Sequence, residues 1–126
     1  DEVIDILNRV RGPFNVSQLA QKAGIAALDD EKFIKNSIVH NKKWRLKLSQ
    51  ELEQIGLSVL PSVGNFVAIQ FKDPEQAEAC RLHLQDSGVL VRQIGAYGMP
   101  DFLRISIGLD HEMFLAIKSI KEYIES

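Results

Sequence analysis

The period of the hydrophobic pattern first changes from helical spacing close to Gly56. Upstream of Gly56, apolar side chains recur at helical spacing, and the longest run predicts a single helix over residues 30–55. Downstream, short segments rich in β-branched and aromatic residues predict strands that alternate with helices. The predicted strands cover residues 57–60, 66–71, 89–92 and 102–107, and residues 94–101 are expected to form a loop.

The order of these elements predicts an α+β fold. We expect a small mixed or antiparallel sheet of about four strands, packed by helices and preceded by long N-terminal helices. Cap residues mark the predicted ends of the helices. They are Asn15 with Gln18 three residues later, Asp29 or Asp30, Gly56 in a left-handed conformation, Asp73 followed by Pro74, and Asp110.

Charge and cysteine content narrow the class of protein. The 126 residues carry 15 basic and 17 acidic side chains, so neither nucleic acid nor an anionic membrane is expected as a partner. The single cysteine, Cys80, rules out a disulfide framework and suits a small buried residue of a cytoplasmic protein. No apolar run approaches the ~18 residues that cross a bilayer.

Residue spacing indicates neither a metal site nor a nucleophile. The three histidines, His40, His83 and His111, lack the spacing of metal ligands and are expected at the surface. No glycine loop precedes a helix as phosphate-binding loops do, and no Ser-His-Asp or Cys-His set can be argued. No catalytic residue is therefore assigned.

Arg104 is the exception, because it interrupts an apolar predicted strand. By alternation, Phe102, Arg104 and Ser106 share one face of that strand, and the opposite face is the natural core face. A guanidinium held by a strand can grip a carboxylate or phosphate through two hydrogen bonds, and Arg92 ends the preceding predicted strand near the same loop. A structural ion pair or an exposed arginine is the alternative interpretation.

Four segments in order resemble the histidinol-phosphate aminotransferases, which are fold-type-I, class I and II enzymes dependent on pyridoxal phosphate. They are residues 7–16 (LNRVRGPFNV), 61–66 (PSVGNF), 88–92 (GVLVR) and 95–108 (GAYGMPDFLRISIG). The resemblance extends over the whole chain with its spacing intact. It implies that Arg104 binds the anionic end of the substrate and that Arg92 assists with the phosphate. Asn65 and Tyr97 are weaker candidates for substrate binding.

The same resemblance implies a role within a longer enzyme. That enzyme would be a cytoplasmic homodimer that exchanges amino groups between histidinol phosphate and 2-oxoglutarate in histidine biosynthesis. The chain starts at Asp1 without an initiator Met, and we expect a C-terminal piece of it. Residues 1–28 would end the large domain, and residues 29–126 would form the small domain with the long interdomain helix.

The chain by itself is expected to be inactive. None of its lysines lies in the context that the family uses for the Schiff base, so no cofactor-binding residue is assigned to it. The cofactor would be bound by the missing large domain.

Three alternatives remain open at this point. Within the same fold, an aromatic-amino-acid aminotransferase or a threonine-phosphate decarboxylase would look similar over this region. The chain could also be a stand-alone module that binds a small anion. It could finally be an interaction protein whose apolar faces in residues 2–28 dock a partner.

Overall fold

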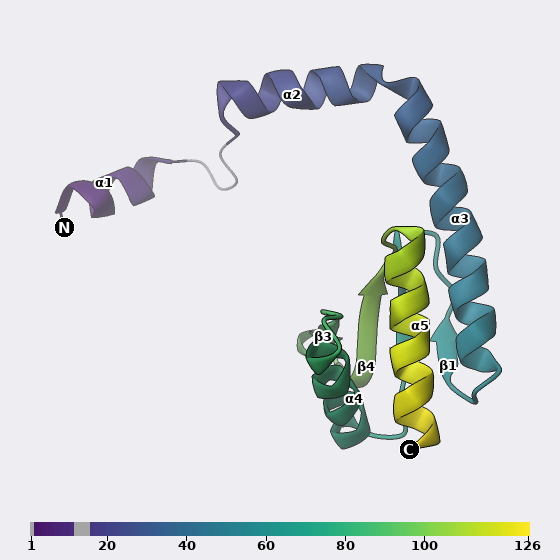
Figure 1. The fold of residues 1–126 in the computed structure, drawn as a ribbon. Helices are drawn as coiled ribbons and strands as arrows, with labels where there is room; N and C mark the ends of the chain where they lie inside the picture. Colours follow the sequence, from purple (N-terminus) through teal and green to yellow (C-terminus); the bar gives the residue numbers. More distant parts are fainter. Residues whose placement is uncertain (1, 12–15) are drawn as a thin grey trace. The chain divides into compact units, whose positions relative to one another are not determined.

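The computed structural model describes residues 2–11 and 16–126, which divide into two units, residues 1–36 and 37–126 (Figure 1). The elements are α1 (Glu2–Val10), α2 (Gln18–Asp29), α3 (Glu31–Glu53), β1 (Ser58–Leu60), β2 (Phe66–Gln70), α4 (Pro74–Asp86), β3 (Arg92–Ile94), the 3-10 helix η1 (Gly95–Tyr97), β4 (Met99–Ser106) and α5 (Asp110–Glu125).

The first unit consists of helices whose described side chains are not buried. Ser17 caps α2 by accepting a hydrogen bond from the N–H of Ala20, and Asp30 caps α3 by accepting one from the N–H of Phe33. The predicted cap at Asn15 lies outside the described residues. Large apolar side chains are exposed in this unit, including Leu19 at 81%. The boundary that we predicted between residues 28 and 29 stays a prediction.

The second unit contains a four-stranded sheet in the order β1-β2-β4-β3, with each neighbouring pair antiparallel. The sheet and its helices confirm the predicted α+β class. In this register Arg104 of β4 lies opposite Ala68 on β2 and opposite Arg92 on β3. Directly opposed residues in an antiparallel pair point to the same face, so these three side chains share one face of the sheet.

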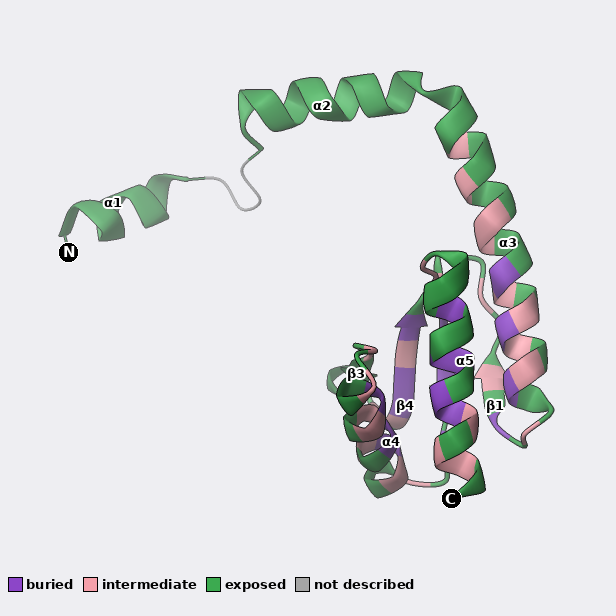
Figure 2. Ribbon diagram, viewed as in Figure 1, coloured by how far each residue is buried: buried purple, intermediate pink, exposed green. Residues whose placement is uncertain are grey.

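The core lies on the other face of the sheet. Val67 and Ile69 of β2 and Leu103 and Ile105 of β4 pack in one cluster with the buried stripes of α3, α4 and α5 (Figure 2). The helical members are Trp44, Leu48, Leu52, Ala77, Cys80, Leu84, Met113, Ala116, Ile117 and Ile120. The alternation predicted for the last strand is thus confirmed, and the face that carries Arg104 has only a small apolar cluster of Ala68, Ile94 and Phe102 with Met99.

Besides the cap at Asp30, two further predicted helix ends are confirmed and one is wrong. Gly56 has a φ of 85° after α3, and Asp73 caps α4 by accepting a hydrogen bond from the N–H of Gln76. Asp110, however, does not cap α5. The cap position is Leu109, whose N–H donates to the carboxylate of Glu112 at 2.7 Å, and this leaves Asp110 free to bind elsewhere.

The strand predicted over residues 89–92 is also displaced. Gly88, with a φ of 80°, and the Val89 N–H, which donates to the Leu84 carbonyl, close the C-terminal end of α4. Residues 89–91 are therefore a connection, and Arg92 begins β3 rather than ending a strand.

The predicted loop over residues 94–101 is shorter than expected. Gly98 adopts a φ of 78° at the end of η1, which reverses the chain so that Ile94 pairs with Met99. β4 consequently begins at Met99, three residues before the predicted start of the last strand. Among the described helices, none is long and apolar enough to cross a membrane.

Candidate anion-binding site

Arg104 lies half-buried in the middle of β4, on the sheet face opposite the core. Within the described residues its guanidinium has no ion-pair or hydrogen-bond partner, and its Nε is buried. A buried polar atom without a partner is unusual in a folded protein and calls for an explanation. The alternative of a structural ion pair within the described residues is therefore not what the structure shows.

Arg92 is the cross-strand neighbour of Arg104. Like charges at directly opposed positions of a sheet destabilise it unless something of opposite charge lies between them. Arg92 is exposed, and it too has no carboxylate partner in the described part of the chain. Two uncompensated guanidinium groups on one sheet face thus make an attractive site for an anion.

The carboxylate that contacts β3 is already engaged. Glu78 on α4 accepts hydrogen bonds from Arg81 at 2.6 and 2.7 Å and from the side chain of Gln93 at 2.6 Å. The hydrogen bond from Arg81 is the main reason that the pKa of Glu78 is lowered. Glu78 therefore serves the other face of the sheet, because Gln93 alternates with Arg92 along β3.

Tyr97 joins the arginine pair from η1. The Cζ of Arg92 lies 5.8 Å from the centre of the Tyr97 ring, and its Nη2 approaches the Tyr97 hydroxyl at 3.4 Å, a long hydrogen bond. The tyrosine is 65% exposed, so its hydroxyl is accessible. The structure thus brings together three of the four residues singled out in the sequence.

Asn65 contributes through its backbone. Its carbonyl accepts a hydrogen bond from the N–H of Ile107 at 2.7 Å, which extends the pairing of β2 with β4 by one step. The Asn65 side chain is exposed and makes no hydrogen bond to another described residue.

Phe66 belongs to the site and was missed by sequence reasoning. Its ring, at the start of β2, lies 5.0 Å from the Cζ of Arg104. Phe66 ends the segment PSVGNF, but the register that puts it beside Arg104 could not be read from the sequence.

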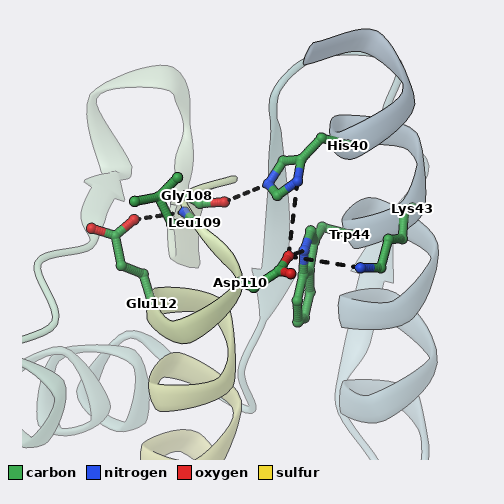
Figure 3. A network of polar contacts seen from close by, with 7 residues as sticks. All are labelled: His40, Lys43, Trp44, Gly108, Leu109, Asp110 and Glu112. Atoms are coloured by element: carbon green, nitrogen blue, oxygen red, sulfur yellow. Dashed lines mark hydrogen bonds and ion pairs between the residues drawn. The ribbon is translucent and has the colours of Figure 1, made fainter. Parts of the chain in front are cut away.

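A second polar network joins α3 to the β4–α5 connection (Figure 3). The indole N–H of Trp44 donates to the carboxylate of Asp110, and a ring nitrogen of His40 lies 2.8 Å from the carbonyl oxygen of Gly108. The ammonium of Lys43 is 3.7 Å from the same carboxylate. The bond from Trp44, and then Lys43 and His40, lower the pKa of Asp110 against a partial opposing effect of burial.

The prediction that all three histidines lie at the surface was wrong for two of them. His40 is half-buried in this network, and His83 has a buried Nε2 and lies with its ring 5.7 Å from that of Tyr123. His111 is exposed as predicted. Among the described residues, no group of three His, Cys, Asp or Glu side chains could hold a metal ion.

Comparison with known proteins decides the family. The model of the class I and II aminotransferases matches residues 1–118. The chain belongs to the class I and II aminotransferase family. Among curated relatives of this aminotransferase chain, the histidinol-phosphate aminotransferase of Hyphomonas neptunium is 47% identical over 112 residues, which cover 87% of the chain and 30% of the relative. That of Rhodopseudomonas palustris is 42% identical over 97% of the chain and 34% of the relative.

Solved structures of aminotransferases agree in fold. The histidinol-phosphate aminotransferase of Sinorhizobium meliloti, solved in complex with pyridoxal 5'-phosphate, superposes with a TM-score of 0.82 at 31% identity. That match covers 95% of this chain and 33% of the solved one. The chain therefore spans about a third of the length of the relatives it matches.

Proposed function

We propose that this chain is the substrate-anion clamp of a longer aminotransferase that acts on histidinol phosphate. The observation that carries the proposal is the Arg92–Arg104 pair, two directly opposed residues whose guanidinium groups have no carboxylate partner among the described residues. The names of the relatives in Hyphomonas and Rhodopseudomonas support histidinol phosphate as the substrate.

A guanidinium clamp suits the two substrates that such a transamination needs. Histidinol phosphate carries a phosphate, whereas glutamate and 2-oxoglutarate carry a second carboxylate. The planar fork of an arginine accepts either anion through two parallel hydrogen bonds, so one site can serve both halves of the reaction. The arginines bind and orient the substrate, and they move no proton themselves.

Pyridoxal phosphate would be the cofactor of the longer enzyme, as in the Sinorhizobium structure. The described residues do not by themselves fit it. No lysine occurs in β1, β2, β3 or β4, so the face that carries Arg104 offers no strand amine for the cofactor. We therefore assign this chain the anion site alone and expect the 126 residues to be inactive in isolation. The longer enzyme is expected to be a cytoplasmic homodimer.

Kinetics of the longer enzyme test this proposal. Arg104→Lys keeps the charge but loses the fork, and it should raise KM for histidinol phosphate and for 2-oxoglutarate by about ten- to a hundredfold, as expected for one charge-assisted hydrogen bond. Lys118→Ala, at an exposed position of α5, is the control and should leave both KM values unchanged.

Two outcomes would contradict the proposal. Unchanged KM values in Arg104→Lys would contradict the proposed role of Arg104 in binding the substrate anion. High activity on phenylpyruvate with none on histidinol phosphate would instead contradict histidinol phosphate as the substrate and favour an aromatic-amino-acid aminotransferase.

A further inference from the structure

The turn that leads into β2 is fixed from two sides. The hydroxyl of Ser62 donates to the carbonyl oxygen of Phe66 at 2.6 Å and accepts from the N–H of Gly64 at 3.2 Å. From α3, Nη1 of Arg45 donates to the carbonyl oxygens of Val63 and Gly64 at 3.0 and 2.7 Å. Phe66 therefore starts its strand from a braced backbone rather than from a loose loop.

Gly64 also limits where the Phe66 ring can lie. A Cβ at position 64 would come within 3.3 Å of Cε1 of that ring, which is tighter than ordinary contact. The absence of a side chain at Gly64 thus leaves room for the ring.

The Phe66 ring also lies next to Arg104. The guanidinium carbon is 5.0 Å from the ring centre, within the range of a cation–π contact. The Nε of Arg104 is buried without a hydrogen-bond partner among the described residues. The two terminal nitrogens of Arg104 are not among the buried atoms that lack a partner. Only the terminal nitrogens can therefore meet a ligand, and they would do so end-on.

From this geometry we propose that Phe66 is a positioning residue for Arg104. The ring shields Nε and holds the guanidinium so that its two terminal nitrogens face the substrate anion. The Arg45-braced turn and Gly64 hold the ring itself. This inference rests on the proposed function, because it assumes that Arg104 binds the anion.

The contact should act on binding rather than on turnover. A flexible arginine loses rotamer freedom when it grips an anion, and a ring that already holds it reduces that loss. Phe66→Leu removes the aromatic face at similar polarity and should raise KM for histidinol phosphate and for 2-oxoglutarate by about three- to tenfold. The kcat at saturation should stay within about twofold.

The test uses the longer enzyme with a graded set of rings at position 66. Phe66→Tyr keeps the aromatic face and should retain KM close to that of the parent. Pentafluorophenylalanine at the same position keeps the shape of the ring but reverses its quadrupole, so it should raise KM as leucine does. Because its shape is nearly that of phenylalanine, this last variant remains informative if Phe66→Leu fails to fold.

Phe114→Leu is the matched control. Phe114 also carries a cation, with Nζ of Lys47 at 4.4 Å from its ring centre, but it belongs to α5, in the layer of helices on the core side of the sheet. Its replacement should leave the KM for histidinol phosphate and the KM for 2-oxoglutarate unchanged. A rise in KM equal to that of Phe66→Leu would show a general effect of lost aromatic contacts and would overturn the inference.

The remaining outcomes separate this inference from the proposed function. If Arg104→Lys raises KM but Phe66→Leu and pentafluorophenylalanine at position 66 do not, the proposed function of Arg104 is supported and the role of Phe66 is overturned. If Phe66→Tyr raises KM as much as leucine does, the aromatic face is not the cause and the inference is again overturned. If Arg104→Lys has no effect, the proposed function and the inference fail together.

Discussion

At the scale of single residues, the cross-strand register sets what each side chain can do. Arg104 would be an ordinary strand arginine if a carboxylate lay opposite it, but Arg92 occupies that position. Both arginines could be selected from the sequence as candidate anion-binding residues. The face of Arg104 could be predicted as well, since alternation along one strand is a local signal. It could not predict that the two lie directly opposite each other or that Phe66 lies beside Arg104, because register depends on pairing between distant segments.

Burial makes Cys80 an unreactive thiol. It is fully buried in α4, and desolvation of the thiolate raises its pKa to about 12. The native chain at pH 8 should therefore not react with a thiol reagent such as Ellman's reagent over minutes, whereas the chain unfolded in guanidinium should react with one equivalent. Rapid stoichiometric labelling under native conditions would contradict this packing.

Asp110 should make stability depend on acid pH. Its pKa is lowered in the folded chain, chiefly by the hydrogen bond from Trp44, so its contribution is complete above about pH 5 and is lost as the pH falls through about 4 and below. In Asp110→Asn, urea unfolding at pH 7 and pH 3 should differ less than in the parent chain. Asp86→Asn, at an exposed position, should keep the parent's pH dependence. An unchanged pH dependence in Asp110→Asn would rule out the predicted effect.

At the scale of elements, the apolar stripe of α3 forms part of the core of the second unit. Trp44, Leu48 and Leu52 are spaced by four residues and are all fully buried against the sheet. This spacing could be read from the sequence, as could the end of the helix at Gly56, because both signals are local. The start of β3 could not, because the apolar run before Arg92 has the composition of a strand but forms the connection from α4.

Leu48→Ala should be strongly destabilising. The change leaves a cavity in the core and should lower the free energy of unfolding by about 2–5 kcal/mol, measured by urea denaturation. Leu46→Ala is the matched control on the same helix, because Leu46 is 57% exposed, and it should stay within about 0.5 kcal/mol of the parent. Equal losses in the two variants would contradict the assignment of the buried face.

The β4–α5 connection depends on the small size of Gly108. A Cβ there would clash with Oε2 of Glu112, the oxygen that accepts the hydrogen bond from the Leu109 N–H at the start of α5. Gly108→Ala should therefore displace that carboxylate and lower the free energy of unfolding by about 1 kcal/mol, the usual cost of a lost cap.

A double-mutant cycle checks this mechanism. Glu112→Ala alone should cost a similar amount, and adding Gly108→Ala to it should cost little more. Costs that simply add would mean that the two residues act independently, against the predicted clash.

At the scale of the whole molecule, the sheet separates the core from the face that carries the two arginines. Helices α3, α4 and α5 all pack on one face, and the other face presents the arginine pair. The fold class followed from the order of periodic segments, and the family from motifs spread along the chain. Neither signal could predict what would complete the proposed anion site, because the chain spans about a third of the length of its relatives.

The structure of the longer enzyme with histidinol phosphate bound would test the central claim most directly. We predict that phosphate oxygens lie about 2.7–2.9 Å from the terminal nitrogens of Arg104, with Arg92 on the same anion. A phosphate bound elsewhere, with Arg104 paired to a carboxylate of its own protein, would contradict the account.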